Sequence, residues 1–296
     1  MSIFSSLQFV LNHPLNRNEP FNALLRFLRW QLGSRLIQGA IIHDWIEGAR
    51  FVARTGDTGL TGNIYAGLHE FEDMAFVLHV LRPDDLFIDV GANVGAYTIL
   101  ACAVAGARGA AFEPVPATSN RLLENLRINS IENQVQLHQK GVGNASGVLR
   151  FTSGLDTMNH ALSDGESQTG TLEVPVTTLD TAVDITSATI IKIDVEGYET
   201  PVLEGATRVL ENPSVHAVVM ELNGSGTRYG YDESVILAKM SGLGFEPFSY
   251  NPYSRSLINL AGKNLNSGNT IFVRNTEFVG NRLQSAGPVR IFNVTL

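Results

Sequence analysis

Apolar and polar positions follow two different patterns along this chain. In its central part, short apolar runs alternate with longer segments whose apolar residues recur at helical spacing, so the runs predict buried strands and the longer segments predict helices. The strand-like runs are LFIDV (86–90), GAAFEP, VQLHQKGVG, ATIIKIDVEG and HAVVMELNG (216–224). The clearest helix is residues 117–130, with Leu122, Leu123 and Leu126 on one side. This alternation indicates an α/β fold whose mostly parallel sheet is covered by helices on both faces.

The alternation is interrupted after the third of these runs. GVLRFTS at residues 147–153 and TLEVPVTTLD at 171–180 are both strand-like with no helix between them, and they predict a β insertion. The polar segment 154–170 that joins them is long enough to cover a site. A helix is expected over about residues 200–210. GFEPFSY and NTIFVRN then predict two late strands with a loop between them.

Residues 1–58 differ from the rest of the chain, and we expect them to form an N-terminal helical segment ahead of a main domain at 59–296. Through residue 54 this segment holds six arginines and three acidic residues, a net charge of +3 (6 − 3), whereas the whole chain carries −8. Leucines at helical spacing, interleaved with arginines, predict a helix within residues 21–46. Such a helix can pack on its own domain, join two subunits of a homo-oligomer, or lie on an anionic membrane.

Composition narrows the classes of function. The 296 residues are 44% hydrophobic and 17% charged, as in soluble globular proteins with a sizeable core. A net charge of −8 argues against nucleic-acid binding, which needs a cationic face. The single cysteine, Cys102, excludes a disulfide framework and is expected in the core. We expect a cytoplasmic protein, because the first residues lack the features of a secretory signal and no apolar run is long enough to span a bilayer.

Glycines and acidic residues gather where the first two predicted strands end. FIDVGANVGAYT places Asp89, Gly91, Asn93 and Gly95 at the end of the first strand, and Glu113 ends the second. Ligands of such sheets bind beyond the carboxyl ends of the strands, where glycines let the backbone approach them closely. Glu113 follows Gly91 by 22 residues (113 − 91), a spacing that suits a carboxylate bound to two ribose hydroxyls. The pattern predicts an adenosine-type ligand.

Asp89 discriminates between two adenosine cofactors. The pyrophosphate of NAD would lie against the glycine turn, where a carboxylate at about 5 Å opposes each phosphate charge by roughly 3 kcal/mol at an effective dielectric near 20. S-adenosylmethionine instead carries an ammonium and a sulfonium, which a carboxylate attracts. Ala96 and Tyr97 also stand where the dinucleotide fingerprint needs a third glycine. These residues favour S-adenosylmethionine; a helix cap is the alternative role of Asp89.

Acidic residues also follow the two later strand runs. In IIKIDVEGYE, Asp194 and Glu196 come directly after an apolar run, where burying a carboxylate is costly without a function. Methyl transfer to a hydroxyl needs a base near the acceptor oxygen, and either residue can serve. His160 in the insertion loop is a further candidate base, and Glu221 a candidate for binding the substrate. A metal site built from Asp194, Glu196 and Glu221 is conceivable, but their spacing is not diagnostic and we predict no metal.

Four motifs, taken in order, resemble the FkbM family of S-adenosylmethionine-dependent methyltransferases. They are FIDVGANVGAYT, AFEPVPATSNRLLENLRIN, VTTLD and IIKIDVEGYETPVLEGA. The resemblance covers about residues 60–275, and KIDVEG followed by VLEGA is its most specific part. It implies a Rossmann-like methyltransferase fold of seven strands, the last one antiparallel. It also implies O-methylation of a hydroxyl, on a sugar of a glycan or glycolipid or on a polyketide-type natural product.

The resemblance further implies roles for individual residues. The methionine part of the cofactor would be held by Asp89, Gly91, Asn93 and Gly95, the ribose by Glu113, and adenine would be flanked by Val142. Asp194 and Glu196 match the acidic pair of the family, which we assign to catalysis, with Asp194 also near the cofactor. His160 lies in a loop that varies with substrate in such enzymes, so its role stays open.

Two other functions remain as alternatives. A nicotinamide-dependent oxidoreductase or epimerase acting on sugars would use a related fold, but Asp89 disfavours its cofactor. A non-catalytic protein that binds the cofactor only as a scaffold is disfavoured by the acidic residues at two strand ends. For a methyltransferase, we expect the insertion loop and the Gly/Thr-rich stretch 53–67 to shape the pocket of a small-molecule or glycan acceptor.

Overall fold

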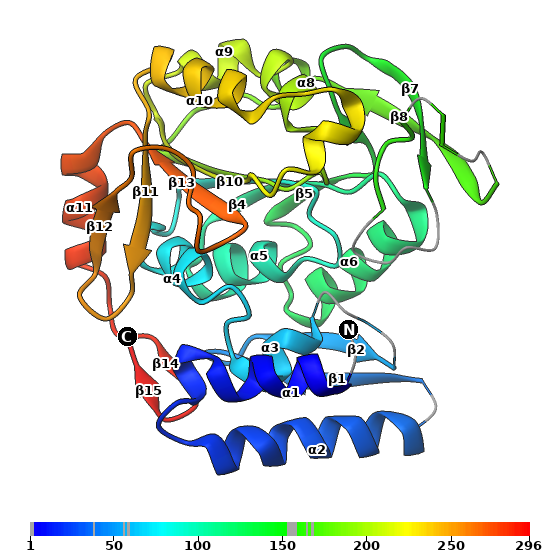
Figure 1. Cartoon of the computed structure of the whole chain (residues 1–296), viewed down its shortest axis with the longest axis vertical. Coiled ribbons are helices and arrows are strands. Elements are labelled where there is room, and N and C mark those ends of the chain that lie inside the picture. Colours follow the sequence, from blue (N-terminus) through cyan, green and yellow to red (C-terminus); the bar gives the residue numbers. More distant parts are fainter. Residues whose placement is uncertain are drawn as a thin grey trace.

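The structure is a computed structural model that describes residues 3–37, 39–55, 57, 60–152, 159–163, 165–166 and 169–296. A central sheet lies between two layers of helices, and an N-terminal unit packs below the lower layer (Figure 1). The strands of the central sheet are β3 (Leu86–Val90), β4 (Arg108–Phe112), β5 (Val135–His138), β9 (Thr189–Ile193), β10 (Val215–Glu221), β11 (Glu246–Asn251), β12 (Ser256–Asn259) and β13 (Asn269–Val273).

The central sheet has the strand order β12-β11-β13-β10-β9-β3-β4-β5. The strands from β10 to β5 are parallel to their neighbours, and β13 runs antiparallel to both β10 and β11. Seven of the strands form the expected Rossmann-like methyltransferase sheet with its last strand reversed. The eighth, β12, pairs with β11 at the edge, in a segment that we expected to be a loop. The strand order reverses between β3 and β9, where such sheets bind ligands.

Helices cover both faces of the sheet, as the sequence predicts. One face packs against α8 (Glu199–Glu204), α9 (Thr207–Glu211) and α10 (Glu233–Gly242), and the other against α4 (Phe71–Val80), α6 (Pro116–Ile128) and α11 (Thr276–Gln284). In β3, Leu86 and Ile88 pack in the core on the first of these faces, whereas Phe87 packs in the core on the second. A strand buried on both faces reads as one apolar run, and the sequence pattern therefore locates these strands well.

Two helical segments are each divided in the structure. Residues 94–107 form α5 (Ala96–Ile99) followed by a π-helical turn, η2 (Leu100–Val104), which contains Cys102 in the core at 2% exposure, as expected. The helix expected near 200–210 is split into α8 and α9. Gly205 lies at this break, where a Cβ would be 2.0 Å from the carbonyl oxygen of Gly143, so the helical layer and the β insertion are in close contact.

The predicted β insertion is a separate three-stranded sheet with the order β6-β8-β7. Its strands are β6 (Gly141–Val142), β7 (Gly147–Thr152) and β8 (Thr171–Thr177). Part of the loop between β7 and β8, residues 153–158, 164, 167 and 168, lies outside the described residues. The remaining elements are η1 (Pro14–Asn16), α7 (Leu179–Ala182), η4 (Ser225–Tyr229), β14 (Arg290–Ile291) and β15 (Val294–Thr295).

The N-terminal unit contains less helix than expected. It comprises α1 (Ile3–Asn12), α2 (Pro20–Leu36), an antiparallel hairpin of β1 (Ala40–Asp44) and β2 (Arg50–Arg54), and α3 (Thr61–Ala66). The hairpin stands where we expected helix. Glu47 and Gly48 both adopt positive φ, 49° and 83°, which reverses the chain between the two strands. The predicted boundary at residues 58 and 59 lies outside the described residues and stays a prediction. The unit shares a core with Val94 and Ile99 of the main domain.

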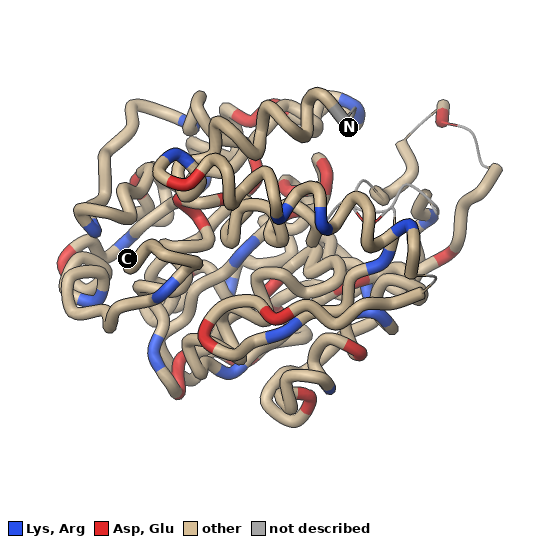
Figure 2. Tube along the Cα trace, turned by 90° about the horizontal axis from the view of Figure 1, so that it is seen from below, with Lys and Arg blue, Asp and Glu red and all other residues tan. Residues whose placement is uncertain are grey.

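Helix α2 packs on its own chain through one face and exposes apolar side chains on the other. Ala23, Phe27 and Trp30 are buried, whereas Leu32 and Leu36 are 63% and 82% exposed. Seen from below, the molecule shows charges of both signs interspersed rather than one cationic patch (Figure 2). Membrane or subunit contact through α2 stays a prediction. Among the described helices, none combines the length and the apolar character that a bilayer crossing requires.

Candidate active site

The candidate site lies at the carboxyl ends of β3, β4, β9 and β10. The loop after β3 passes directly against the loop after β9: Gly91 has φ +82°, and a Cβ there would lie 1.8 Å from the carbonyl oxygen of Asp194. The backbone N–H of Asp194 donates to the carbonyl of Val90 at 2.9 Å. Only glycine permits this approach without displacing the neighbouring loop. The glycine turn therefore forms the floor of a crevice between the two central strands.

Glu113 is buried beneath this turn at 6% exposure. Its carboxylate accepts a hydrogen bond from the backbone N–H of Asn93 at 3.1 Å and another from that of Val115 at 2.9 Å. Burial raises the pKa of Glu113 to about 7, and these two N–H donors oppose the shift. Each carboxylate oxygen keeps a further lone pair, so the geometry allows the two ribose contacts that the sequence predicts.

Asp89 lies deeper, at 2% exposure. The hydroxyl of Thr98 in α5 donates to its Oδ2 at 2.6 Å. Burial raises the pKa of Asp89 to about 6, opposed by the side-chain and backbone hydrogen bonds from Thr98 and by the charge of Lys192. Asp89 thus contacts α5 through Thr98 and also lines a cavity at the site, whereas the N-cap residue of α5 is Gly95.

Gly95 and Val142, which are also predicted to contact the cofactor, have different surroundings. Gly95, at the start of α5, has φ +94°, and a Cβ there would lie 2.3 Å from Cδ1 of Leu122. Its lack of a side chain lets α6 pack on this turn, and Gly95 does not line the cavities described below. Val142 of β6 is 5% exposed and lines the same cavity as Glu113. The β insertion therefore supplies an apolar wall at the place predicted for adenine.

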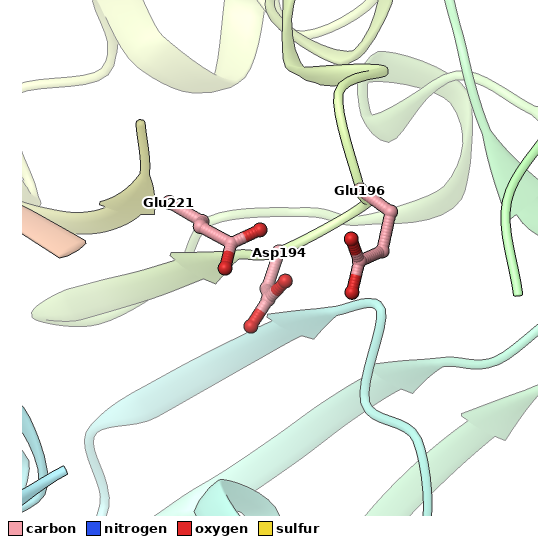
Figure 3. A group of neighbouring side chains, drawn as sticks. All are labelled: Asp194, Glu196 and Glu221. Atoms are coloured by element: carbon pink, nitrogen blue, oxygen red, sulfur yellow. The ribbon is translucent and has the colours of Figure 1, made fainter. Parts of the chain in front are cut away.

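Asp194, Glu196 and Glu221 come together at the ends of β9 and β10 (Figure 3). One carboxylate oxygen of each lies within 4.8 Å of those of the other two. Glu196 reaches this position from a tight turn in which it adopts φ +55°. Burial, and next the charge of Asp194, raise the pKa values of both Glu196 and Glu221. The trio could hold a cation or retain a proton, and a raised pKa makes Glu196 an effective proton acceptor.

Lys192, a buried residue of β9, neutralises part of the negative charge of this acidic cluster. It is 1% exposed, and its ammonium donates to Asp194 at 3.0 Å and to Asn269 at 2.9 Å. Burial alone would lower the pKa of Lys192, but the carboxylates of Asp194, Glu70 and Glu221 raise it overall, so the side chain stays charged. An ammonium so close to Asp194 competes with a metal ion for that carboxylate.

Glu70 belongs to the same network and was missed by the sequence analysis. Its Oε1 accepts from Asn269 at 2.8 Å and its Oε2 from the hydroxyl of Tyr97 at 2.8 Å. Glu70 precedes α4, and Asn269 begins β13, 199 residues later. No local spacing relates these positions, although Glu70 falls within the stretch that resembles the family.

His160 is not brought into the lining of the site. It lies in the insertion loop at 7% exposure, and its Nε2 is 3.1 Å from Oε1 of Glu166. Its backbone N–H donates to Thr152 at the end of β7. Neither cavity described below includes it among the described residues, although its charge acts on Glu196. The geometry thus favours Glu196 over His160 as the base, and the predicted role of His160 stays a prediction.

Two cavities meet at the glycine turn. Four predicted residues line both of them: Gly91, Asn93, Asp194 and Glu196. The first also includes Glu113 and Val142, with Phe112 and Phe151 as apolar walls that the sequence analysis missed. The second, of about 270 Å³, includes Asp89, Glu70 and Glu221. We call them the nucleoside cavity and the acidic cavity. The lining groups of the first match those of adenosine, but its volume of about 50 Å³ is smaller than this nucleoside, so binding has to widen it; the lining of the second suits positive charge.

One curated relative shares part of this chain. It is the hexuronic acid methyltransferase AglP of Haloferax volcanii, 29% identical over 157 residues, which are 52% of this chain. The match spans 62% of the length of that relative.

Several solved structures align with much of this chain at low similarity. An rRNA methylase from Streptococcus thermophilus aligns with 68% of this chain and 91% of its own, at 15% identity and a TM-score of 0.39. A precorrin-6Y C5,15-methyltransferase from Geobacter metallireducens aligns with 75% of this chain and 92% of its own, at 12% identity and a TM-score of 0.39.

The family comparison covers the strand ends that form the site, but not Glu70. Residues 89–271, well over half of the chain, match the methyltransferase FkbM domain. The matched region begins at Asp89 and extends beyond Asn269. It therefore includes every strand end described above, and it leaves out the residues that precede β3. This chain belongs to the FkbM methyltransferase family.

Proposed function

We propose that this methyltransferase uses S-adenosylmethionine to methylate a hydroxyl of a saccharide acceptor. The observation that carries the proposal is the junction of the two cavities, where Asp194 and Glu196 face both of them. The nucleoside cavity offers Glu113 to the ribose and apolar walls to adenine. The acidic cavity offers Asp89 and Asp194 to an ammonium and a sulfonium. When bound, the cofactor supplies a methyl group activated by the positive charge on sulfur.

The residues at the junction can position the acceptor and accept its proton. An acceptor hydroxyl hydrogen-bonded to Glu196 becomes more nucleophilic, because the carboxylate takes up the proton as the oxygen–carbon bond forms. Glu196 is suited to this because burial raises its pKa. Asp194, fixed by Lys192 at 3.0 Å, stays available for the positively charged part of the cofactor. The products are a methyl ether, the demethylated cofactor and a proton on Glu196.

The saccharide acceptor is supported by chemistry and by the named relative. That relative is a hexuronic acid methyltransferase. A hydroxyl fits the acidic cavity better than a carboxylate, because Glu70, Asp194, Glu196 and Glu221 would repel a second anion near the reacting atoms. A polyketide-type hydroxyl fits the same geometry and is the alternative acceptor.

Transfer of a labelled methyl group tests this function. We expect the full chain, given S-adenosylmethionine labelled at its methyl group, to label glucuronic-acid-containing oligosaccharides in an alkali-stable form, because a methyl ether survives alkali and a methyl ester does not. A polyketide macrolactone serves as the comparison acceptor. Alkali-labile label would show that a carboxylate is the acceptor. Cofactor binding without transfer to either acceptor class would favour a non-catalytic scaffold.

A further inference from the structure

A third cavity adjoins the acidic cavity on the side of the N-terminal unit. It has a volume of about 280 Å³ and lies among α1, α2 and α3. His69 lines both this cavity and the acidic cavity, so the two are neighbours across one imidazole ring. We call it the N-terminal cavity. Its position allows one extended acceptor to contact both cavities at once.

The walls of the N-terminal cavity combine aromatic faces with hydrogen-bonding groups. Trp30 and Tyr65 are 9% and 6% exposed and form part of the lining, and Phe9 stacks on His69 with ring centroids 4.9 Å apart. The amide of Gln31 donates to the hydroxyl of Tyr65 at 2.8 Å. Sugar rings present both apolar C–H faces and hydroxyl edges, so a wall of this kind suits a saccharide.

Arg35 gives this cavity a positive charge. Its guanidinium donates to Oε1 of Gln31 at 2.7 Å, which orients it on the last turn of α2. Among the described residues, no carboxylate lies within ion-pairing distance of Arg35. The acid that also lines the cavity, Asp57, is paired with Arg121 at 2.5 Å. A carboxylate on a ligand would therefore find a guanidinium without a competing acid.

The acidic cavity has the opposite character. Its lining includes five carboxylates, those of Glu70, Asp89, Asp194, Glu196 and Glu221, and one ammonium, that of Lys192. An anionic acceptor is repelled there unless its charged group lies elsewhere. The neighbouring N-terminal cavity provides a place for that charged group.

We propose that the N-terminal cavity binds an acidic sugar residue of the acceptor, with its ring against Trp30 and its carboxylate on Arg35. The neighbouring sugar residue then presents a hydroxyl to Glu196 in the acidic cavity. This assignment rests on the proposed function and adds the class of substrate: an acidic saccharide of at least two residues. It also gives the N-terminal unit, which lies outside the matched family region, a role in specificity.

Tryptophan fluorescence can test this subsite, because Trp30 is one of only two tryptophans in the chain. The full chain is titrated with a disaccharide that carries one glucuronic acid residue, and with the matched disaccharide that carries glucose. Both titrations are run with and without S-adenosylhomocysteine and repeated by calorimetry. The variants are Arg35→Gln and, as a matched control, Arg29→Gln, which is exposed on the same helix and lines none of the three cavities.

We expect the acidic disaccharide to bind about tenfold more tightly than the neutral one, because a charge-assisted contact is lost in the latter. Arg35→Gln should abolish that difference, and Arg29→Gln should preserve it. Unchanged S-adenosylhomocysteine affinity in Arg35→Gln would verify its fold. Equal affinity for the two disaccharides in the unmodified protein, or an effect of Arg29→Gln equal to that of Arg35→Gln, overturns the subsite. Either result leaves the proposed function standing, whereas failure to bind S-adenosylhomocysteine counts against that function alone.

Discussion

Replacing Glu113 with alanine should weaken the binding of S-adenosylhomocysteine by at least about a hundredfold. Hydrogen bonds to charged groups contribute about 1.5–3 kcal/mol each, and two ribose hydroxyls would lose their shared acceptor. The alanine also leaves the buried N–H groups of Asn93 and Val115 without their partner, which loosens the glycine turn. Isothermal titration calorimetry of the variant and the unmodified protein measures the difference.

The same carboxylate should make cofactor binding depend on pH. Burial raises the pKa of Glu113 to about 7, so in the free protein the carboxylate becomes protonated as the pH falls through that value. Because ribose hydroxyls donate to the ionised form, affinity should decrease below about pH 7. Glu113→Gln should lose this dependence. Glu132→Ala, at an exposed position outside the cavities, is the matched control. Equal affinity of Glu113→Ala and Glu132→Ala would remove Glu113 from the ribose role.

Replacing Glu196 with glutamine should lower kcat by about 10²–10⁴, the usual contribution of a general base, while cofactor affinity changes little. The amide keeps the size of the side chain but cannot take up the acceptor proton. In the unmodified enzyme, kcat should rise with pH as Glu196 ionises, because the protonated acid is inactive as a base and burial raises its pKa. Initial rates with labelled S-adenosylmethionine, measured across pH, test both expectations.

His160→Asn provides the comparison for this prediction. His160 is bonded to Glu166 in the insertion loop and does not line the cavities, so its replacement should reduce kcat much less than Glu196→Gln does. If His160→Asn abolishes turnover and Glu196→Gln retains the full rate, the roles assigned to the two residues are reversed. Calorimetry with S-adenosylhomocysteine shows in each case whether the cofactor site is intact.

The sequence predicts the central sheet well and the N-terminal unit poorly, for physical reasons. LFIDV and its counterparts are buried on both faces, so their apolar runs identify them without any knowledge of the fold. The hairpin of β1 and β2 was mistaken for helix because Ile41, Ile42 and Ile46 also fit a helical period. Its turn depends on positive φ at Glu47, which the sequence does not predict because glutamate rarely adopts that conformation. The break at Gly205 depends on contact with Gly143, 62 residues away (205 − 143).

The site was predictable where its residues follow strands and unpredictable where they meet only in space. Gly91, Glu113 and Asp194 stand at strand ends, and the strand order brings them together. Gly95 was assigned to the cofactor, but its packing against Leu122 explains its lack of a side chain. Glu70 joins the acidic cluster through Asn269, a relation that only tertiary structure creates.

Calorimetric titration of the unmodified protein with S-adenosylhomocysteine and, separately, with NADH tests the central claim most directly. That claim is that the acidic groups beside the glycine turn select a cofactor with a cationic amino-acid tail, which S-adenosylmethionine and S-adenosylhomocysteine share, over one with a pyrophosphate. A carboxylate at about 5 Å disfavours each phosphate charge by roughly 3 kcal/mol at an effective dielectric near 20. We predict saturable binding of S-adenosylhomocysteine and no measurable binding of NADH. Saturable NADH binding that S-adenosylhomocysteine does not displace would contradict the account.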